Sequence, residues 1–346
     1  MNGRERALAL IDGNPVDRIP LMPITMMFAA DQIGVKYGQY VTDYRVMVEA
    51  QLRTAERFDI DLVSTISDPA REAGDLGAKV RVFDDQPPAF VESDALIADK
   101  TVLSNLKVPD PASTRRMLDR IQAVALLKQK IGNERIVEGW IEGPCALAAN
   151  VRGINTLMLD FYDDPPFVDE LLTFVTEVGI AFARAQRDAG ADLMGVGDAA
   201  ASLVGRPIFE KILVPYHMKL VAALRAMGLK TRSHICGNTS KICEARAALG
   251  YDINDIDSPV SLELAREKMG PKAIILGNIP TVAVMERGTA EQVRAAAAGC
   301  YRACGQNHII SAGCEVPRSS PIENMDALRD YAHSLTTEGN AAQAAR

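Results

Sequence analysis

Short apolar runs alternate with longer amphipathic stretches along most of this chain. Each run is followed by apolar residues at helical spacing, which is the pattern of a strand followed by a helix. Eight runs fit this description: residues 19–22, 62–65, 136–140, 193–196, 231–235, 252–256, 273–276 and 308–310. A repeated strand-then-helix order requires parallel strands joined by crossovers. Eight such units within about 300 residues predict a closed (β/α)8 TIM barrel, which is an α/β fold.

Three stretches have the clearest helical spacing: 167–187, 207–227 and 290–303. The first follows Asp163, Asp164 and two prolines, a typical helix start. Within residues 77–93, alternating positions and the pair Pro87-Pro88 predict a hairpin-like insertion over the barrel mouth. We therefore expect residues 1–335 to form one barrel domain. The polar residues 336–346 are expected to form a flexible C-terminal tail.

Composition narrows the possible partners. Hydrophobic residues make up 48% of the 346, and 38 Lys and Arg stand against 45 Asp and Glu, a formal charge of −7. Without a run of basic residues, the chain offers no attraction for nucleic acid or for anionic membranes. No segment approaches about 18 uninterrupted apolar residues, so we expect no membrane span. Six irregularly spaced cysteines with no secretory signal predict a cytoplasmic protein with reduced thiols.

In a parallel barrel, the residues that follow each strand line the face that carries function. Seven of the predicted strands are followed by polar residues, of which five groups contain an acid and two contain cysteine. These groups are Ser67-Asp68, Glu142-Gly143-Pro144, Gly197-Asp198, Cys236-Gly237-Asn238, Asp257-Ser258, Gly277-Asn278 and Gly313-Cys314-Glu315. The barrel mouth is therefore expected to be the functional face.

One histidine stands out because His234 ends a predicted strand two residues before Cys236. Residues i and i+2 of an extended chain point the same way, so the ring nitrogen and the sulfur can meet at one ion. Catalytic zinc takes three protein ligands and keeps a fourth position open. Cys314 supplies a third ligand in the barrel arrangement, since its loop opens onto the same face.

Other interpretations of these residues compete with a metal site. Cys236 and Cys314 could be small apolar fillers, which is the commoner role of buried cysteine. Cys300 and Cys304 form another pair, four residues apart in an Ala-rich helix, and are typical of packing. The pattern Gly195-x-Gly197-x-x-Ala200 could be a dinucleotide fingerprint, but Asp198 would then face a pyrophosphate.

Several motifs together resemble the uroporphyrinogen decarboxylase superfamily. They lie at residues 4–6 (RER), 15–20 (PVDRIP), 234–239 (HICGNT), 277–280 (GNIP), 313–317 (GCEVP) and 321–324 (PIEN), and the resemblance spans about residues 4–331. More narrowly, the chain resembles the zinc-dependent methyltransferase branch, which includes methylcobamide:coenzyme M methyltransferases and corrinoid-dependent O-demethylase methyltransferases. The family fold is a TIM barrel, in agreement with the strand count.

Two differences separate this chain from the true decarboxylases. Those enzymes carry a Met-Arg-Gln-Ala-Gly-Arg segment whose arginines meet the carboxylates of a tetrapyrrole, whereas residues 24–31 here read ITMMFAAD and no arginine lies between Arg18 and Arg45. They also carry Gly-His near the last strand, where this chain has Gly313-Cys314. In the methyltransferase branch, His-x-Cys and a late Cys bind zinc, and these match His234, Cys236 and Cys314.

The resemblance implies Zn²⁺ and a corrinoid (cobalamin) as cofactors. A zinc-bound thiol is deprotonated and can accept a methyl group from the corrinoid, while a zinc-bound methyl ether can give one up. Glu142, Asp198 or Asp68 could protonate a leaving oxygen or orient the substrate, or could instead have structural roles. Glu315 could be a partner of the zinc ligands or a transient fourth ligand.

We expect the corrinoid to arrive on a separate carrier protein. Carriers that bind cobalt through histidine resemble one another in Asp-x-His-x-x-Gly, and Arg232 replaces the Asp here. Met26, Met27 and Asn278 are the residues expected beside the corrinoid or the methyl substrate, although methionine-rich stretches are more often core.

The predicted function is methyl transfer between a small methylated compound and the carrier's cobalt. Many thiol-specific members of the branch that this chain resembles have a small residue at the position of Glu315, so the resemblance favours a methyl ether, with a methylated amine, a thiol or a folate-type acceptor as further possibilities. The alternatives are a cofactor-free uroporphyrinogen-type decarboxylase and a barrel that binds a ligand without turnover.

Overall fold

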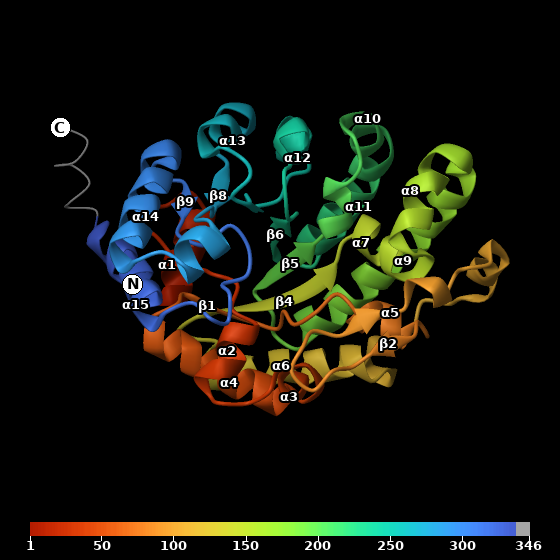
Figure 1. Cartoon of the computed structure of the whole chain (residues 1–346), viewed down its shortest axis with the longest axis horizontal. Helices are drawn as coiled ribbons and strands as arrows, with labels where there is room; N and C mark the ends of the chain where they lie inside the picture. Colours follow the sequence, from red (N-terminus) through yellow and green to blue (C-terminus); the bar gives the residue numbers. More distant parts are fainter. Residues whose placement is uncertain (337–346) are drawn as a thin grey trace.

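A parallel sheet of seven strands forms the centre of the molecule (Figure 1). The structure is a computed structural model and describes residues 1–336. The strands are β1 (Leu62–Ser64), β4 (Ile136–Glu142), β5 (Leu193–Gly197), β6 (Lys230–His234), β7 (Ile253–Asp255), β8 (Ile274–Leu276) and β9 (His308–Ile309). Helices surround the outside of this sheet, as expected for a (β/α)8 barrel. The predicted fold class is confirmed.

Each strand pairs in parallel with the next strand of the sheet, in the order β1-β4-β5-β6-β7-β8-β9. At the carboxyl ends, Glu142 of β4 is opposite Gly197 of β5, which is opposite His234 of β6, which is opposite Asp255 of β7. These four positions form one layer across the barrel mouth. The register therefore places side chains that are distant in sequence at the same depth.

The first predicted strand, residues 19–22, forms only an isolated bridge between Leu21 and Ile310. The Met22 amide donates to the Ile310 carbonyl, and the Asp61 amide donates to the Leu21 carbonyl. The segment therefore closes the ring between β9 and β1. Pro20 and Pro23 flank its centre and lack N–H groups, which explains why a longer ladder does not form.

Helices connect the strands and cover them. The α-helices are α1 (Gly3–Ile11), α2 (Met27–Gln32), α3 (Tyr37–Thr42), α4 (Tyr44–Phe58), α5 (Arg71–Asp75), α6 (Arg116–Ile131), α7 (Pro144–Arg152), α8 (Ile154–Asp163), α9 (Pro165–Asp188), α10 (Arg206–Ile208), α11 (Val214–Ala226), α12 (Cys243–Ala248), α13 (Leu262–Met269), α14 (Ala290–Cys304) and α15 (Ile322–Ser334). Short 3₁₀ or π turns are η1 (Glu92–Asp94), η2 (Lys100–Asn105), η3 (Pro111–Ser113), η4 (Ala199–Ser202), η5 (Phe209–Leu213), η6 (Ser240–Ile242) and η7 (Thr281–Glu286).

Local signals explain where the long helices begin and where one is interrupted. The Asp164 side chain caps α9, and Thr289 forms a capping box with Gln292 at the start of α14. The helix predicted over 207–227 is instead divided into α10, the π turn η5 and α11. Pro215 lacks an N–H and its ring crowds the carbonyl four residues earlier, which explains the wider turn before it.

The predicted insertion forms an antiparallel hairpin of β2 (Val80–Arg81) and β3 (Ala89–Phe90). Thr336, the first residue of the predicted tail, bridges Arg18, and the rest of that tail (337–346) lies outside the described residues. None of the helices within residues 1–336 has the length and apolarity that a membrane crossing requires.

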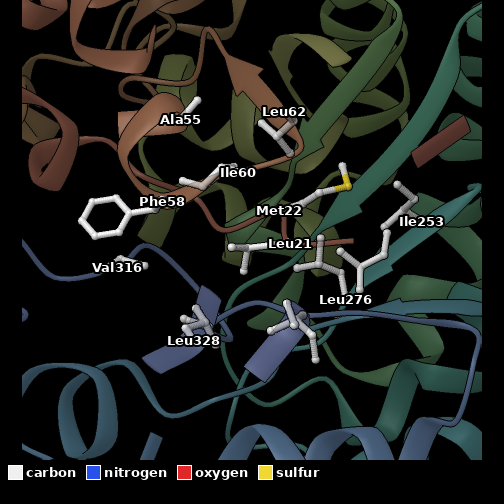
Figure 2. Close-up of a cluster of buried hydrophobic side chains, with 14 of the residues drawn as sticks. Leu21, Met22, Ala55, Phe58, Ile60, Leu62, Ile253, Leu276, Val316 and Leu328 are labelled. Carbon is white, nitrogen blue, oxygen red and sulfur yellow. The ribbon is translucent and has the colours of Figure 1, made fainter. Parts of the chain in front are cut away.

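The closing segment is buried in the main core. Figure 2 shows Leu21 and Met22 among the side chains of Leu62, Ile253 and Leu276, which come from β1, β7 and β8. All five side chains are almost fully buried. Apolar packing therefore holds the segment inside the barrel even though its backbone pairing is short.

Asp61 also holds the closing segment around Leu21, through hydrogen bonds and ion pairs. Its carboxylate accepts hydrogen bonds from the Leu21 amide (2.7 Å) and from Arg18 Nη1 (3.0 Å), and it also pairs with Arg6. The Asp61 side chain is fully buried and both arginines are nearly so. Removal of one partner from a buried ion pair leaves an uncompensated charge, which is costly.

We expect Asp61→Asn to lower the free energy of unfolding by about 3 kcal/mol, because it leaves the buried Arg6 and Arg18 with only the half-exposed Asp17 and Asp59 as acidic partners. Urea denaturation measures the change. Asp59→Asn is the matched control, since Asp59 also pairs with Arg18 but is half exposed, and should cost less than about 1 kcal/mol. Equal losses in the two variants would contradict the assigned role of Asp61.

Candidate metal centre

Three potential metal ligands converge at the carboxyl end of the barrel. His234 ends β6, Cys236 follows two residues later, and Cys314 lies in the loop after β9. His234 Nε2 is 3.0 Å from Cys236 Sγ and 3.6 Å from Cys314 Sγ, and the two sulfurs are 3.6 Å apart. The three residues predicted from the sequence are therefore brought together, with one ligand atom of each within 4.8 Å of the others.

Asp255 orients the imidazole of His234. Asp255 Oδ2 lies 2.8 Å from His234 Nδ1, and a carboxylate accepts hydrogen bonds, so Nδ1 is the donor. Nε2 is then free to face the two sulfurs. This is the arrangement found in carboxylate–histidine–metal triads. Burial lowers the pKa of His234, but Asp255 and Cys314 outweigh it and raise that pKa to about 9.

A buried ionic network holds Asp255 in turn. Arg232 donates to both Asp255 oxygens (2.9 Å and 2.8 Å) and to Glu138 Oε1 (3.1 Å). All three side chains are essentially inaccessible to solvent. Although burial alone raises the pKa of Asp255, Arg232 and His234 hold it below its usual range. Asp255 therefore keeps its charge beneath the candidate metal centre.

The two thiols differ in acidity. The hydrogen bond from Cys236 lowers the pKa of Cys314, against the effect of burial and with help from His234. The same contact and burial raise the pKa of Cys236. One imidazole nitrogen and two sulfurs are the ligand types of a catalytic zinc site of the Cys₂His type. The residues present therefore fit a zinc ion.

Trp140 lies beside His234, one member of this cluster. Its ring lies 6.1 Å from the His234 ring, and a side chain at Gly195 would meet the indole at 2.2 Å. Gly195 and Gly197 therefore make room for Trp140, which accounts for glycines that could have suggested a dinucleotide fingerprint. Met26 packs against the small apolar cluster of Ile24, Ile66 and Trp140, so one of the two methionines predicted at the mouth lies near Trp140.

Glu315 and Met27 are joined by a hydrogen bond. The Met27 amide donates to Glu315 Oε1 at 2.9 Å. Burial raises the pKa of Glu315 to about 7, and the neighbouring Cys314 adds to this effect. The structure thus places the loop of Met26 and Met27 next to the loop of Cys314. The predicted roles of these residues toward substrate or corrinoid stay predictions.

Asp68 and Glu142 each face an arginine. Asp68 Oδ2 lies 2.7 Å from Arg116 Nη2, and Glu142 Oε1 lies 3.2 Å from Arg71 Nη2. Burial raises the pKa of Asp68, but Arg116 and Arg71 outweigh it and keep that pKa below its usual value. Burial raises the pKa of Glu142 well above its usual value despite Arg71. The two predicted carboxyl groups therefore differ in acidity.

Asp198 and Asn278 bind other parts of the fold. Asp198 is fully buried, accepts hydrogen bonds from the amides of Cys145 and Ala146 at the start of α7, and lies 2.9 Å from His217 Nε2. The Asn278 amide donates to the Val260 carbonyl at 2.6 Å. These contacts give both residues structural roles, and their predicted roles in catalysis or cofactor binding stay predictions.

Sequence reasoning did not identify Asp255, Arg232 or Glu138. A signal was present, because Arg232 and His234 alternate along one buried strand and must point to the same side. A buried arginine requires an acidic partner. Which acid supplies it depends on the register between β6 and β7, and this became known only from the structure.

Comparisons with known proteins agree with this architecture. The methylcobamide:CoM methyltransferase MtbA of Methanosarcina mazei is 28% identical over 337 residues, covering 95% of this chain and 97% of the relative. A uroporphyrinogen decarboxylase of Alkalilimnicola ehrlichii is 24% identical, and the match covers 98% of this chain and 96% of that relative. A solved methyltransferase from Methanosarcina mazei superposes with a TM-score of 0.89 at 21% identity, covering 96% and 99%, and confirms the fold.

The family resemblance predicted from the motifs is confirmed over almost the whole chain. The sequence model of the uroporphyrinogen decarboxylase (URO-D) family matches residues 2–335, which includes His234, Cys236 and Cys314. The protein therefore belongs to the uroporphyrinogen decarboxylase (URO-D) family.

Proposed function

We propose that the protein is a zinc-dependent methyltransferase that moves a methyl group between a small compound and the cobalt of a corrinoid on a separate carrier protein. The observation that carries this proposal is the convergence of His234, Cys236 and Cys314 at the barrel mouth. The methylcobamide:CoM methyltransferases among the relatives support it. The small compound is a methyl ether, a methylated amine or a thiol.

His234 Nε2 and the two sulfurs would hold the zinc. When bound there, zinc supplies a Lewis acid that keeps a thiol deprotonated or makes an ether oxygen a better leaving group. Asp255 fixes the imidazole through Nδ1, so that Nε2 needs no reorientation. Trp140 is almost fully buried and places its ring beside that of His234. Glu315, held by the Met27 amide, is the proposed partner at the open side.

The arginines at the mouth argue against the decarboxylase alternative. Arg116 pairs with Asp68, Arg71 with Glu72, and Arg318 with Asp31. A tetrapyrrole with several carboxylates requires cations that are not already neutralised by the protein. Because these arginines have acidic partners, methyl transfer is the better-supported activity.

We expect Cys314→Ala to lose most bound zinc and all methyl transfer while the barrel stays folded, because two ligands cannot replace three. Zinc is measured by metal analysis of protein purified under reducing conditions. Activity is followed by the absorbance of free methylcobalamin with a thiol acceptor, and of Co(I) cobalamin with a methyl ether donor.

Cys304→Ala is the matched control, because Cys304 is a buried thiol on α14 outside the cluster. It should keep about one zinc per chain and full activity. A zinc-loaded wild-type protein that transfers no methyl group in either direction would overturn the proposed function. Unchanged zinc in Cys314→Ala would overturn the ligand assignment.

We also expect Asp255→Asn to weaken zinc binding by roughly 10–100-fold, because an amide no longer fixes the imidazole as a carboxylate does. Competition with a zinc chelator measures the affinity. Asp252→Asn is a suitable control, since Asp252 precedes the same strand and binds Thr231 and Arg225 instead. Equal zinc affinities for the two variants would contradict the role of Asp255.

A further inference from the structure

A cavity of about 330 Å³ lies at the barrel mouth between the β2–β3 hairpin and α7. Its walls are mainly apolar and come from five segments of the chain. They include Phe90 of β3, Leu96 beyond the hairpin, Ala149 of α7, Ile154 of α8 and Ala200 of η4. This volume lies at the lower end of the range for small-molecule sites and suits a ligand about the size of one ring.

Glu142 is the buried titratable group that lines this cavity. It is 8% exposed and belongs to a buried cluster with Asp68, Glu72, Arg71 and Arg116. Three carboxyl groups thus share two guanidinium groups, so the cluster has one acid in excess. Burial raises the pKa of Glu142 well above its usual value, and Glu72 adds to the effect. A neutral carboxyl group can donate a hydrogen bond.

The charge at the rim is balanced. Lys79 and Asp94 both line the cavity and form an exposed ion pair with each other. The cavity therefore offers mainly apolar walls, the Glu142 carboxyl group, the Asn150 side-chain amide and no net charge to a ligand. These features favour an uncharged molecule with an oxygen or nitrogen acceptor, since a charged ligand would lose its hydration without a counter-charge.

The cavity lies next to the metal centre. Ala199 and Ala200 in its wall belong to η4, and Ser202 of η4 lies 3.6 Å from the position that a Cβ at Gly237 would occupy. Gly237 directly follows Cys236. The amide of Asp198, which precedes η4, donates to the His234 carbonyl at 2.8 Å. One short segment thus separates the cavity from two of the candidate ligands.

We propose that this cavity binds the uncharged, ring-sized body of a small molecule, with Glu142 donating a hydrogen bond to an acceptor atom on it. The further assignment of that molecule as the compound that exchanges its methyl group rests on the proposed function. In that assignment Glu142 and the apolar walls bind the part of the molecule that does not react, and the metal centre binds the reacting atom.

Two ring-sized probes of similar shape and without a transferable methyl group test the site in the full-length, zinc-loaded protein: tetrahydropyran and cyclohexane. Titrations followed by ligand-observed NMR give the affinities. We expect tetrahydropyran to bind roughly fivefold more tightly, as one hydrogen bond to its ring oxygen predicts. Glu142→Gln should keep this preference because the amide still donates, and Glu142→Leu should abolish it.

Substitutions that fill the cavity provide a second test of the same site. Ala149→Phe on α7 and Ala95→Phe on the opposite wall should each weaken binding of both probes by at least about tenfold, because the new ring takes the place of the probe. Using two walls keeps the test valid if one variant does not fold. Ala181→Phe, on the outer side of α9, is the control and should bind as the wild type does.

No binding by the wild-type protein, or equal binding by both filled variants, would overturn the cavity assignment. These outcomes are separate from those for the proposed function. Protein that binds tetrahydropyran as expected but neither holds zinc nor transfers a methyl group overturns the proposed function and leaves the cavity assignment standing. Protein that transfers a methyl group in a zinc-dependent way but does not bind the probes overturns the cavity assignment and leaves the proposed function standing.

Discussion

The buried ion pair between Arg232 and Asp255 determines how the candidate metal centre is built. Arg232 is fully buried inside the barrel and can be tolerated there only with acidic partners, which are Asp255 and Glu138. His234 lies two residues beyond Arg232 on the same strand, so it meets the same carboxylate. Asp255, which neutralises the buried Arg232, therefore also fixes the tautomer and the orientation of His234, a candidate metal ligand.

Closure of the barrel brings the other ligand into place. Cys236 and Cys314 are 78 residues apart, and two strands separate β6 from β9 in the sheet. Their loops meet because parallel strands in a closed ring place all carboxyl ends at one mouth. The closing segment around Leu21 depends on Asp61, whose carboxylate pairs with Arg6 and Arg18. Two buried carboxylates therefore have separate roles at opposite ends of the barrel strands. Asp61 holds the closing segment of the fold, and Asp255 orients His234 at the candidate metal centre.

The sequence contained enough information for the fold and for the three candidate ligands. Apolar runs marked the strands because both faces of a parallel strand are buried, and the spacing of His234 and Cys236 follows from strand geometry. Cys314 was less certain from the residues alone, because a buried cysteine is usually a filler, and the family motifs strengthened its assignment.

The features that the sequence did not reveal are those that depend on contacts between helices, strands and loops. Asp255 could be recognised only once the register with β6 was known. The structural contacts of Asp198 and Asn278 arise from α7 and from the loop at Val260, which no local pattern connects to them. The cavity beside Glu142 forms where a hairpin meets α7, so its volume depends on tertiary packing.

The most direct test of this account is X-ray absorption at the zinc edge of the zinc-loaded, full-length protein. The account predicts two sulfur ligands at about 2.3 Å and one imidazole nitrogen at about 2.0 Å, with the remaining position filled by a light atom. The loss of one sulfur in Cys314→Ala should be visible in the same spectrum. A coordination shell without sulfur, or one with four sulfurs, would contradict the proposed centre.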